Sequence, residues 1–132
     1  MNIESHKKSL RESIDVIEEC IRKGISERQK TIGFHCSSGA IDMMEMLLHK
    51  ESLVSPGFIL KHDWLASERK IKEKMPFDFR NKRKIINSMM FIEERRNLLC
   101  YGKPQREQTI REVIEKFNDL RKTFKELYID EK

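Results

Sequence analysis

Three polar residues interrupt the apolar rows of one long amphipathic segment near its end: Arg96, Asn97 and Tyr101. We expect all three to project from rows that face the core. Burying a guanidinium costs free energy of folding unless the group is paired. Arg96 must therefore form an ion pair, extend its charged end to solvent or have a functional role. Glu93, three residues earlier, can supply the pairing. Periodicity alone favours such a structural salt bridge, whereas an arginine used functionally can stabilise charge on a phosphate.

A second candidate site is the basic segment from Lys61 to Lys84, with nine basic and four acidic residues. It carries the whole formal net charge of +5, because the remaining residues balance at 18 basic and 18 acidic. A local excess of this kind can attract nucleic-acid phosphates, and the candidates for contact are Lys82, Arg83 and Lys84. The alternative, which we favour slightly, is a solvated helix surface, because the segment has no RNA-binding signature.

Five segments with helical apolar spacing position these residues, and no segment alternates apolar and polar residues as a strand does. Gly24 fits the end of the first segment and Ser26 the N-cap of the second, while Pro76 follows the third. The sequence therefore predicts an all-α, antiparallel up-and-down bundle of four to five helices in a single domain over residues 1–132. The expected helices cover residues 3–23, 26–50, 62–74, 81–101 and 107–128.

The second segment contains two glycines, Gly33 and Gly39, in the middle of its helical pattern. Each glycine costs about 1 kcal/mol in helix propensity. Together with Ser37 they keep that part of the helix small, so a neighbouring helix can approach closely. We infer a packing reason or a ligand-approach reason for their presence.

The composition excludes several classes of protein. With 38% hydrophobic and 37% charged residues, the chain is neither collagen-like, low-complexity nor strongly disordered. No uninterrupted apolar run is longer than four residues, whereas a membrane span needs about 20. The first residues lack the apolar stretch of a secretory signal, so we expect a cytoplasmic protein with three reduced cysteines.

The spacing of histidines and cysteines does not favour a metal site. His35 and Cys36, taken together with His49 or Cys20, lack the close paired spacing of structural zinc motifs. We therefore expect no metal and no cofactor. His62, at the start of the third segment, is interpreted as a surface or capping residue.

The stretch ERRNLLCYG at 94–102 resembles the signature region of HEPN domains, which are small all-α bundles with an Arg-polar-x-x-x-His motif late in a long helix. The similarity extends to HDWL at 62–65, MPFDF at 75–79 and SGAID at 38–42, and about 5–127 is compatible with it. The resemblance implies a dimer that brings two motifs together. It also implies an RNA-directed role, because many members are metal-independent endoribonucleases, often toxins encoded beside a minimal nucleotidyltransferase antitoxin.

In that motif the arginine stabilises charge on the scissile phosphate, the polar residue orients groups, and the histidine is the general acid or base. Arg96 and Asn97 match the first two positions, but Tyr101 occupies the position of the histidine. A phenol is a poor proton acceptor at neutral pH. We therefore expect a catalytically degenerate domain that binds RNA, a nucleotide or a cognate nucleotidyltransferase.

Two alternatives stay open: a metal-independent endoribonuclease that acts as a toxin, and a purely structural interaction bundle. The bundle alternative requires Arg96 to be sealed by Glu93 or Asp42 rather than to line an open cleft. A homodimer is also favoured by methionines that give more apolar surface than one small bundle requires, namely Met43, Met44, Met46, Met89 and Met90.

Overall fold

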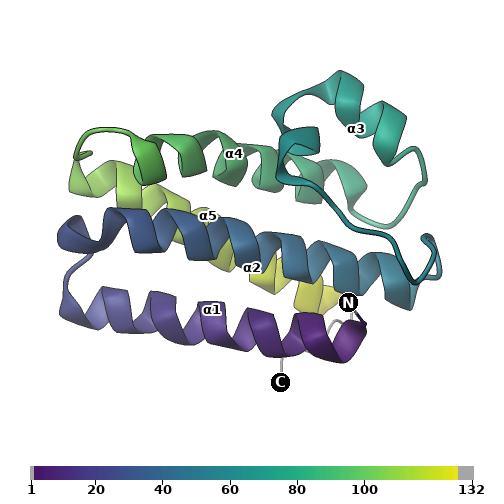
Figure 1. The fold of residues 1–132 in the computed structure, drawn as a ribbon, viewed down its shortest axis with the longest axis horizontal. Coiled ribbons are helices and arrows are strands. Elements are labelled where there is room, and N and C mark those ends of the chain that lie inside the picture. Colours follow the sequence, from purple (N-terminus) through teal and green to yellow (C-terminus); the bar gives the residue numbers. More distant parts are fainter. Residues whose placement is uncertain (1, 128–132) are drawn as a thin grey trace.

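The computed structural model describes residues 2–127, and the described residues contain helices and no strand. Four long helices pack as an up-and-down bundle, and a short fifth helix, α3, lies outside them beside a 3₁₀ turn, η2 (Figure 1). The all-α bundle is therefore confirmed. The elements are α1 (Ile3–Lys23), η1 (Ser26–Arg28), α2 (Gln29–Lys50), η2 (His62–Ala66), α3 (Glu68–Lys74), α4 (Lys82–Tyr101) and α5 (Glu107–Glu126).

The ends of α1 follow from local chemistry. Asn2 is the N-cap, and its Oδ1 accepts a hydrogen bond from the Ser5 amide at 2.9 Å. The helix ends at Gly24, whose φ of 113° is a conformation that favours glycine. The expected cap at Ser26 is wrong, because the chain first makes the turn η1 and α2 begins at Gln29 without a side-chain cap.

α2 is the central helix, because it packs against α1, α4 and α5 (Figure 1). Of its 22 residues, 14 are buried. A Cβ on Gly33 would lie 2.8 Å from the Cβ of Leu99 in α4, and one on Gly39 would lie 2.8 Å from the Phe117 ring in α5. Close helix packing is therefore the reason for both glycines.

The prediction of one continuous helix over residues 62–74 is wrong, because the segment forms two elements, η2 and α3. It divides at Ser67, whose backbone is extended with φ −149° and ψ 146°. The Ser67 hydroxyl accepts a hydrogen bond from the Lys70 amide at 3.1 Å and so caps α3. This break turns η2 onto α4.

The two rows of α4 that were expected to face inward behave differently. The row of Arg96 stays at the core, since Ile92 and Leu99 on either side of it are buried. In the other row Asn97 and Tyr101 are exposed, so the expectation that they face the core is wrong. For Tyr101 the physical reason is helical drift: residues 86 and 101 are 15 positions apart, which rotates the row by about 60° at 3.6 residues per turn. Asn97 is exposed because it lines an open pocket.

The methionines fill the core of the single chain, so they give no support for a dimer: Met43, Met44, Met46 and Met89 are buried, and Met90 is partly buried. The large apolar side chains that are exposed lie elsewhere, at Ile21, Phe34, Ile59, Leu98 and Tyr101. All three cysteines are free thiols. None of the described helices has the length and apolar content to cross a membrane.

The last helix, α5, buries one apolar stripe. The buried residues of this stripe include Ile110, Val113, Phe117 and Phe124. The structure ends α5 at Glu126, and the expected end at residue 128 lies outside the described residues.

We expect Gly33→Ala to lower the free energy of unfolding. The added methyl group must displace Leu99, and overpacking costs about 1–3 kcal/mol, against about 1 kcal/mol gained in helix propensity. Thr31→Ala, at an exposed position of the same helix, is the control and should be neutral or slightly stabilising. Urea denaturation measures both variants, and equal stabilisation by the two would contradict close packing at Gly33.

Candidate functional site

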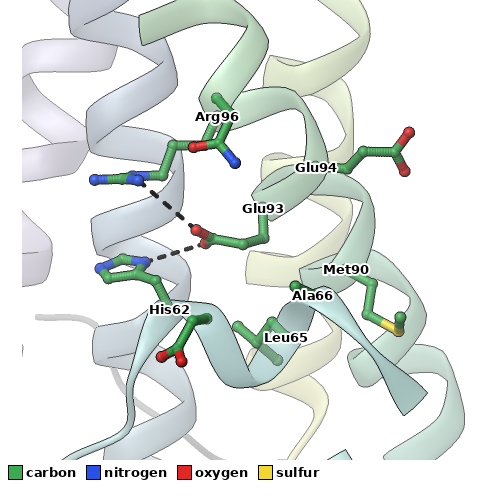
Figure 2. A pocket seen from close by; sticks show the side chains of 9 residues that line it. His62, Leu65, Ala66, Met90, Glu93, Glu94 and Arg96 are labelled. Carbon is green, nitrogen blue, oxygen red and sulfur yellow. Dashed lines mark hydrogen bonds and ion pairs between the residues drawn. The ribbon is translucent and has the colours of Figure 1, made fainter. Parts of the chain in front are cut away.

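A pocket of about 490 Å³ lies between η2 and α4 (Figure 2). Its floor is apolar and its remaining lining is polar. The break at Ser67 and the packing of η2 on α4 bring these residues together from distant parts of the sequence. The lining residues are Leu65, Ala66 and Met90, with His62, Asp63, Glu93, Glu94, Arg96 and Asn97.

His62 is oriented by two groups at its Nδ1 atom. Nδ1 lies 3.1 Å from Glu93 Oε2 and 3.0 Å from Ser37 Oγ. The Ser37 hydroxyl donates its own proton to Glu93 Oε2 at 2.8 Å, so both neighbours of Nδ1 act as acceptors. Nδ1 therefore carries a proton, and Nε2 is the atom of this 39% exposed side chain that can exchange a proton with a bound molecule.

Arg96 forms only a loose ion pair. Its Nη1 lies 3.9 Å from Glu93 Oε1, and its side chain is 22% exposed at the pocket. Its Nε is buried without a hydrogen-bond partner among the described residues. Asp42, the other carboxylate considered as a partner, instead accepts a hydrogen bond from His6 at 2.8 Å. Arg96 thus pairs with Glu93 and also lines an open pocket.

The charges around the pocket disfavour a long polyanion. Glu93 offsets the charge of Arg96, and two exposed carboxylates, Asp63 and Glu94, stand at the rim. Glu94 lies 3.6 Å from Arg95, which partly balances it. A single phosphate can contact Arg96 and the His62 ring, whereas a continuous strand would meet the rim carboxylates.

The structure brings together part of the predicted site. Arg96 and Asn97 line the pocket, but Tyr101 does not, and its side chain is 74% exposed. His62, expected to be a surface or capping residue, lies beside Glu93 although 31 positions separate the two in the sequence. The only sequence signal for this contact is a glutamate in an apolar row, which needs a partner from elsewhere in the fold.

The predicted basic triplet does not form one patch. Lys82 donates hydrogen bonds to the backbone carbonyl oxygens of residues 75 and 77, at 3.0 and 2.6 Å. Arg83 pairs with Glu68 at 2.7 Å. Lys84 lines a groove of about 590 Å³ between α4 and α5, together with Lys116 and Lys122. Lys82 therefore fixes the connection before α4, and Lys84 has the most open surroundings.

The metal ligands considered from the sequence do not converge. His35 shares a hydrogen bond of 3.1 Å with Ser13, and burial lowers the pKa of His35. Cys36 is fully buried, and this burial raises the pKa of its thiol. Neither residue belongs to a group of ligands close enough to hold an ion among the described residues.

Comparison with known proteins gives no assignment: no family model, curated protein or solved structure matches the chain significantly. The pocket at His62 and Arg96 is therefore the basis on which a function is assigned.

We expect Glu93→Gln to lower the free energy of unfolding by about 1–3 kcal/mol. The amide leaves Arg96 without an anion, and its NH₂ group replaces an oxygen that accepts hydrogen bonds from Ser37 and His62. The matched control is Glu94→Gln at the exposed neighbour, for which we expect a change within about 0.5 kcal/mol. Urea denaturation with the two variants in parallel checks this, and equal effects would show that Glu93 does not tie η2 to the bundle.

Proposed function

We propose that the protein is a HEPN-like domain that binds RNA or a nucleotide by holding one phosphate group between Arg96 and His62. The observation that carries the proposal is that these two side chains, from α4 and η2, line one open pocket. The guanidinium is always charged, and the imidazole donates from Nε2 when protonated. Asn97 adds an amide at the same pocket, which fits the orienting role that the resemblance implies.

The shape of the pocket supports a ligand with both an anionic and an apolar part. Its volume of about 490 Å³ is in the range of small-molecule sites, about 300–1,000 Å³. The phosphate would lie at Arg96, and the ribose or base would contact the apolar floor at Leu65 and Met90. The rim carboxylates limit the contact to one phosphate, so we expect a weak dependence of affinity on salt.

A second candidate function is metal-independent RNA cleavage, which the position of His62 favours. Tyr101 is a poor general base, but His62 offers an oriented imidazole beside Arg96. In such a reaction Nε2 would take the proton of a ribose 2′-hydroxyl while that oxygen attacks the phosphorus to form a 2′,3′-cyclic phosphate, and the 5′-oxygen would leave with a proton from water. Arg96 would stabilise the charge that develops on the phosphoryl oxygens.

We expect Arg96→Ala to weaken the binding of a fluorescently labelled single-stranded RNA by roughly 10- to 100-fold, since a charge-assisted phosphate contact contributes about 1.5–3 kcal/mol. Fluorescence anisotropy measures the affinity, with mononucleotides as competitors to separate RNA from nucleotide binding. The matched control is Arg11→Ala, which removes an exposed arginine from α1.

The same RNA, incubated with a chelator and analysed for fragments, separates binding from cleavage. We expect binding without efficient cleavage. Fragments that disappear with His62→Ala would assign the second candidate function instead. Equal affinities for wild type, Arg96→Ala and Arg11→Ala would contradict both functions and leave a structural interaction bundle.

We further propose that the chain forms a homodimer through the end of the bundle where α2 begins and α4 ends. The start of α2 and the end of α4 lie at the same end of the bundle (Figure 1). Phe34 in α2, and Leu98 and Tyr101 in α4, are exposed large apolar residues. A symmetric contact there would cover them and bring two Arg96 pockets near each other. A minimal nucleotidyltransferase, the partner that the resemblance implies, is the alternative occupant of this surface.

Light scattering at micromolar concentration should give about twice the chain mass of 15.8 kDa. Replacing Phe34 and Leu98 together by glutamate should give a monomer, because two charges would be buried at the contact. Ile59→Glu, in the exposed loop between α2 and η2, is the control and should remain dimeric. A wild-type monomer throughout this range would exclude the homodimer.

A further inference from the structure

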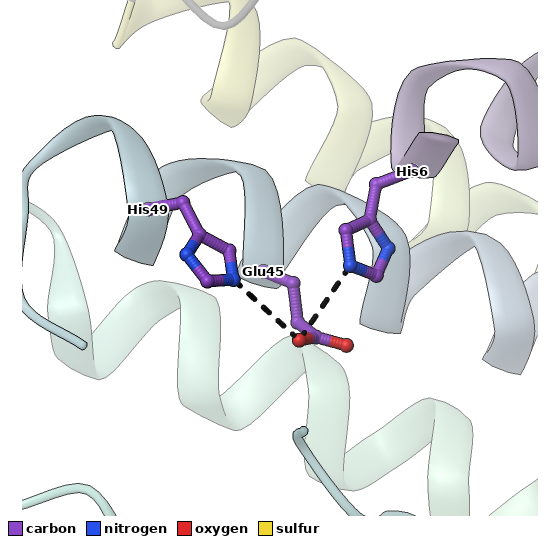
Figure 3. Close-up of side chains that lie close together, drawn as sticks. All are labelled: His6, Glu45 and His49. Carbon is purple, nitrogen blue, oxygen red and sulfur yellow. Dashed lines mark ion pairs between the residues drawn. The ribbon is translucent and has the colours of Figure 1, made fainter. Parts of the chain in front are cut away.

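A separate cluster joins the start of α1 to the end of α2: His6, Glu45 and His49 (Figure 3). Glu45 and His49 are four residues apart on α2, so they lie on the same face of that helix. Glu45 Oε1 lies 3.6 Å from His6 Nε2 and 3.9 Å from His49 Nε2. Both contacts are too long for hydrogen bonds, although all three ligand atoms lie within 4.8 Å of one another.

Both imidazoles present an unsatisfied nitrogen to this cluster. His6 Nε2 and His49 Nε2 are buried, and neither has a hydrogen-bond partner among the described residues. The whole His6 residue is only 3% exposed. Buried polar atoms are nearly always satisfied, so two orphaned nitrogens beside one carboxylate indicate a missing partner at their centre.

Asp42 fixes the orientation of His6 for such a partner. Its Oδ1 accepts a hydrogen bond from His6 Nδ1 at 2.8 Å. Nδ1 is therefore the donor of this hydrogen bond, and Nε2 faces Glu45 and His49. A carboxylate that binds the far nitrogen of a histidine is the usual support for a metal-ligating imidazole.

Burial disfavours the charged forms of two of these groups: it lowers the pKa of His49 and raises the pKa of Glu45. A protonated His6 alone would leave His49 Nε2 without a partner.

We propose that His6, Glu45 and His49 bind one Zn²⁺ ion, with Asp42 supporting His6. Two imidazole nitrogens and a carboxylate oxygen form a frequent zinc donor set. With metal–ligand distances near 2.0–2.1 Å, tetrahedral ligand atoms lie about 3.3 Å apart. The separations of 3.6 and 3.9 Å from Glu45 need to contract by about 0.3 and 0.6 Å, and the two imidazole nitrogens, which lie within 4.8 Å of each other, by up to about 1.5 Å.

The cluster offers three protein ligands, which leaves a fourth coordination position for water or a small ligand. Of the three ligands, His49 also lines a pocket of about 810 Å³ with Asn2, Ile3, Glu4 and Val54. Closed structural zinc sites use four protein ligands, whereas three ligands and an accessible position are typical of zinc that binds water or substrate. This site shares no residue with the pocket at Arg96, so it does not depend on the proposed function.

The test uses the full chain after treatment with a chelator. Calorimetric titration should show one Zn²⁺ per chain, and Co²⁺ should give the visible absorption of a four-coordinate site. His49→Ala should abolish both signals, and Asp42→Asn should lower the affinity by about 10- to 100-fold. The matched control is His35→Ala, which removes a histidine of the same helix that bonds Ser13.

Glu45→Gln keeps the shape of the side chain and serves where His49→Ala fails to fold, as judged by circular dichroism. It should weaken Zn²⁺ binding while the helices stay intact. Folded wild-type protein that binds no stoichiometric Zn²⁺ overturns the proposal. Equal affinity in wild type, His49→Ala and Glu45→Gln also overturns it, because the ion would then lie elsewhere.

Discussion

The burial of α2 against three other helices is the constraint on which both polar clusters depend. A polar side chain on the buried faces of this helix is shut off from water, so a neighbouring helix or a ligand must satisfy it. Toward α4, Ser37 donates to Glu93, and Glu93 in turn holds His62. Toward α1, Glu45 faces His6. The glycines of α2 allow the close packing that places these groups within reach of one another.

Periodicity predicted the number of long helices and most of their ends, because the apolar stripe of each helix is a local property of the sequence. Periodicity did not predict which serine is the N-cap of a helix. Ser26 and Ser67 both precede helical stretches, yet only Ser67 caps a helix. A serine hydroxyl can cap a helix only where a free backbone amide lies within hydrogen-bond distance. Packing against the rest of the protein determines this distance, so the local sequence alone does not predict it.

The sequence predicted the part of the candidate site that lies on a single helix, α4. Arg96 and Asn97 were found because they interrupt apolar rows of α4, and both line the pocket. Tyr101 was predicted on the wrong face because residues spaced three or four positions apart do not stay on one line of the helix. Over four turns such a row rotates around the helix axis. His62 and His6 were missed because each meets its carboxylate across more than 30 positions. Helical periodicity tells which face a residue occupies, but not which residue of another helix it meets.

The two buried glutamates, Glu93 and Glu45, each lie beside histidine, but their surroundings differ. Around Glu93 the contacts are closed: a hydroxyl at 2.8 Å and an imidazole at 3.1 Å form hydrogen bonds with the carboxylate, and a guanidinium lies 3.9 Å away. Nε2 of His62 takes no part in these contacts. Around Glu45 both imidazoles stay beyond hydrogen-bond distance and their nitrogens are unsatisfied. The closed contacts of Glu93 fix the orientation of His62, whereas the open contacts of Glu45 are the basis of the proposed cation site.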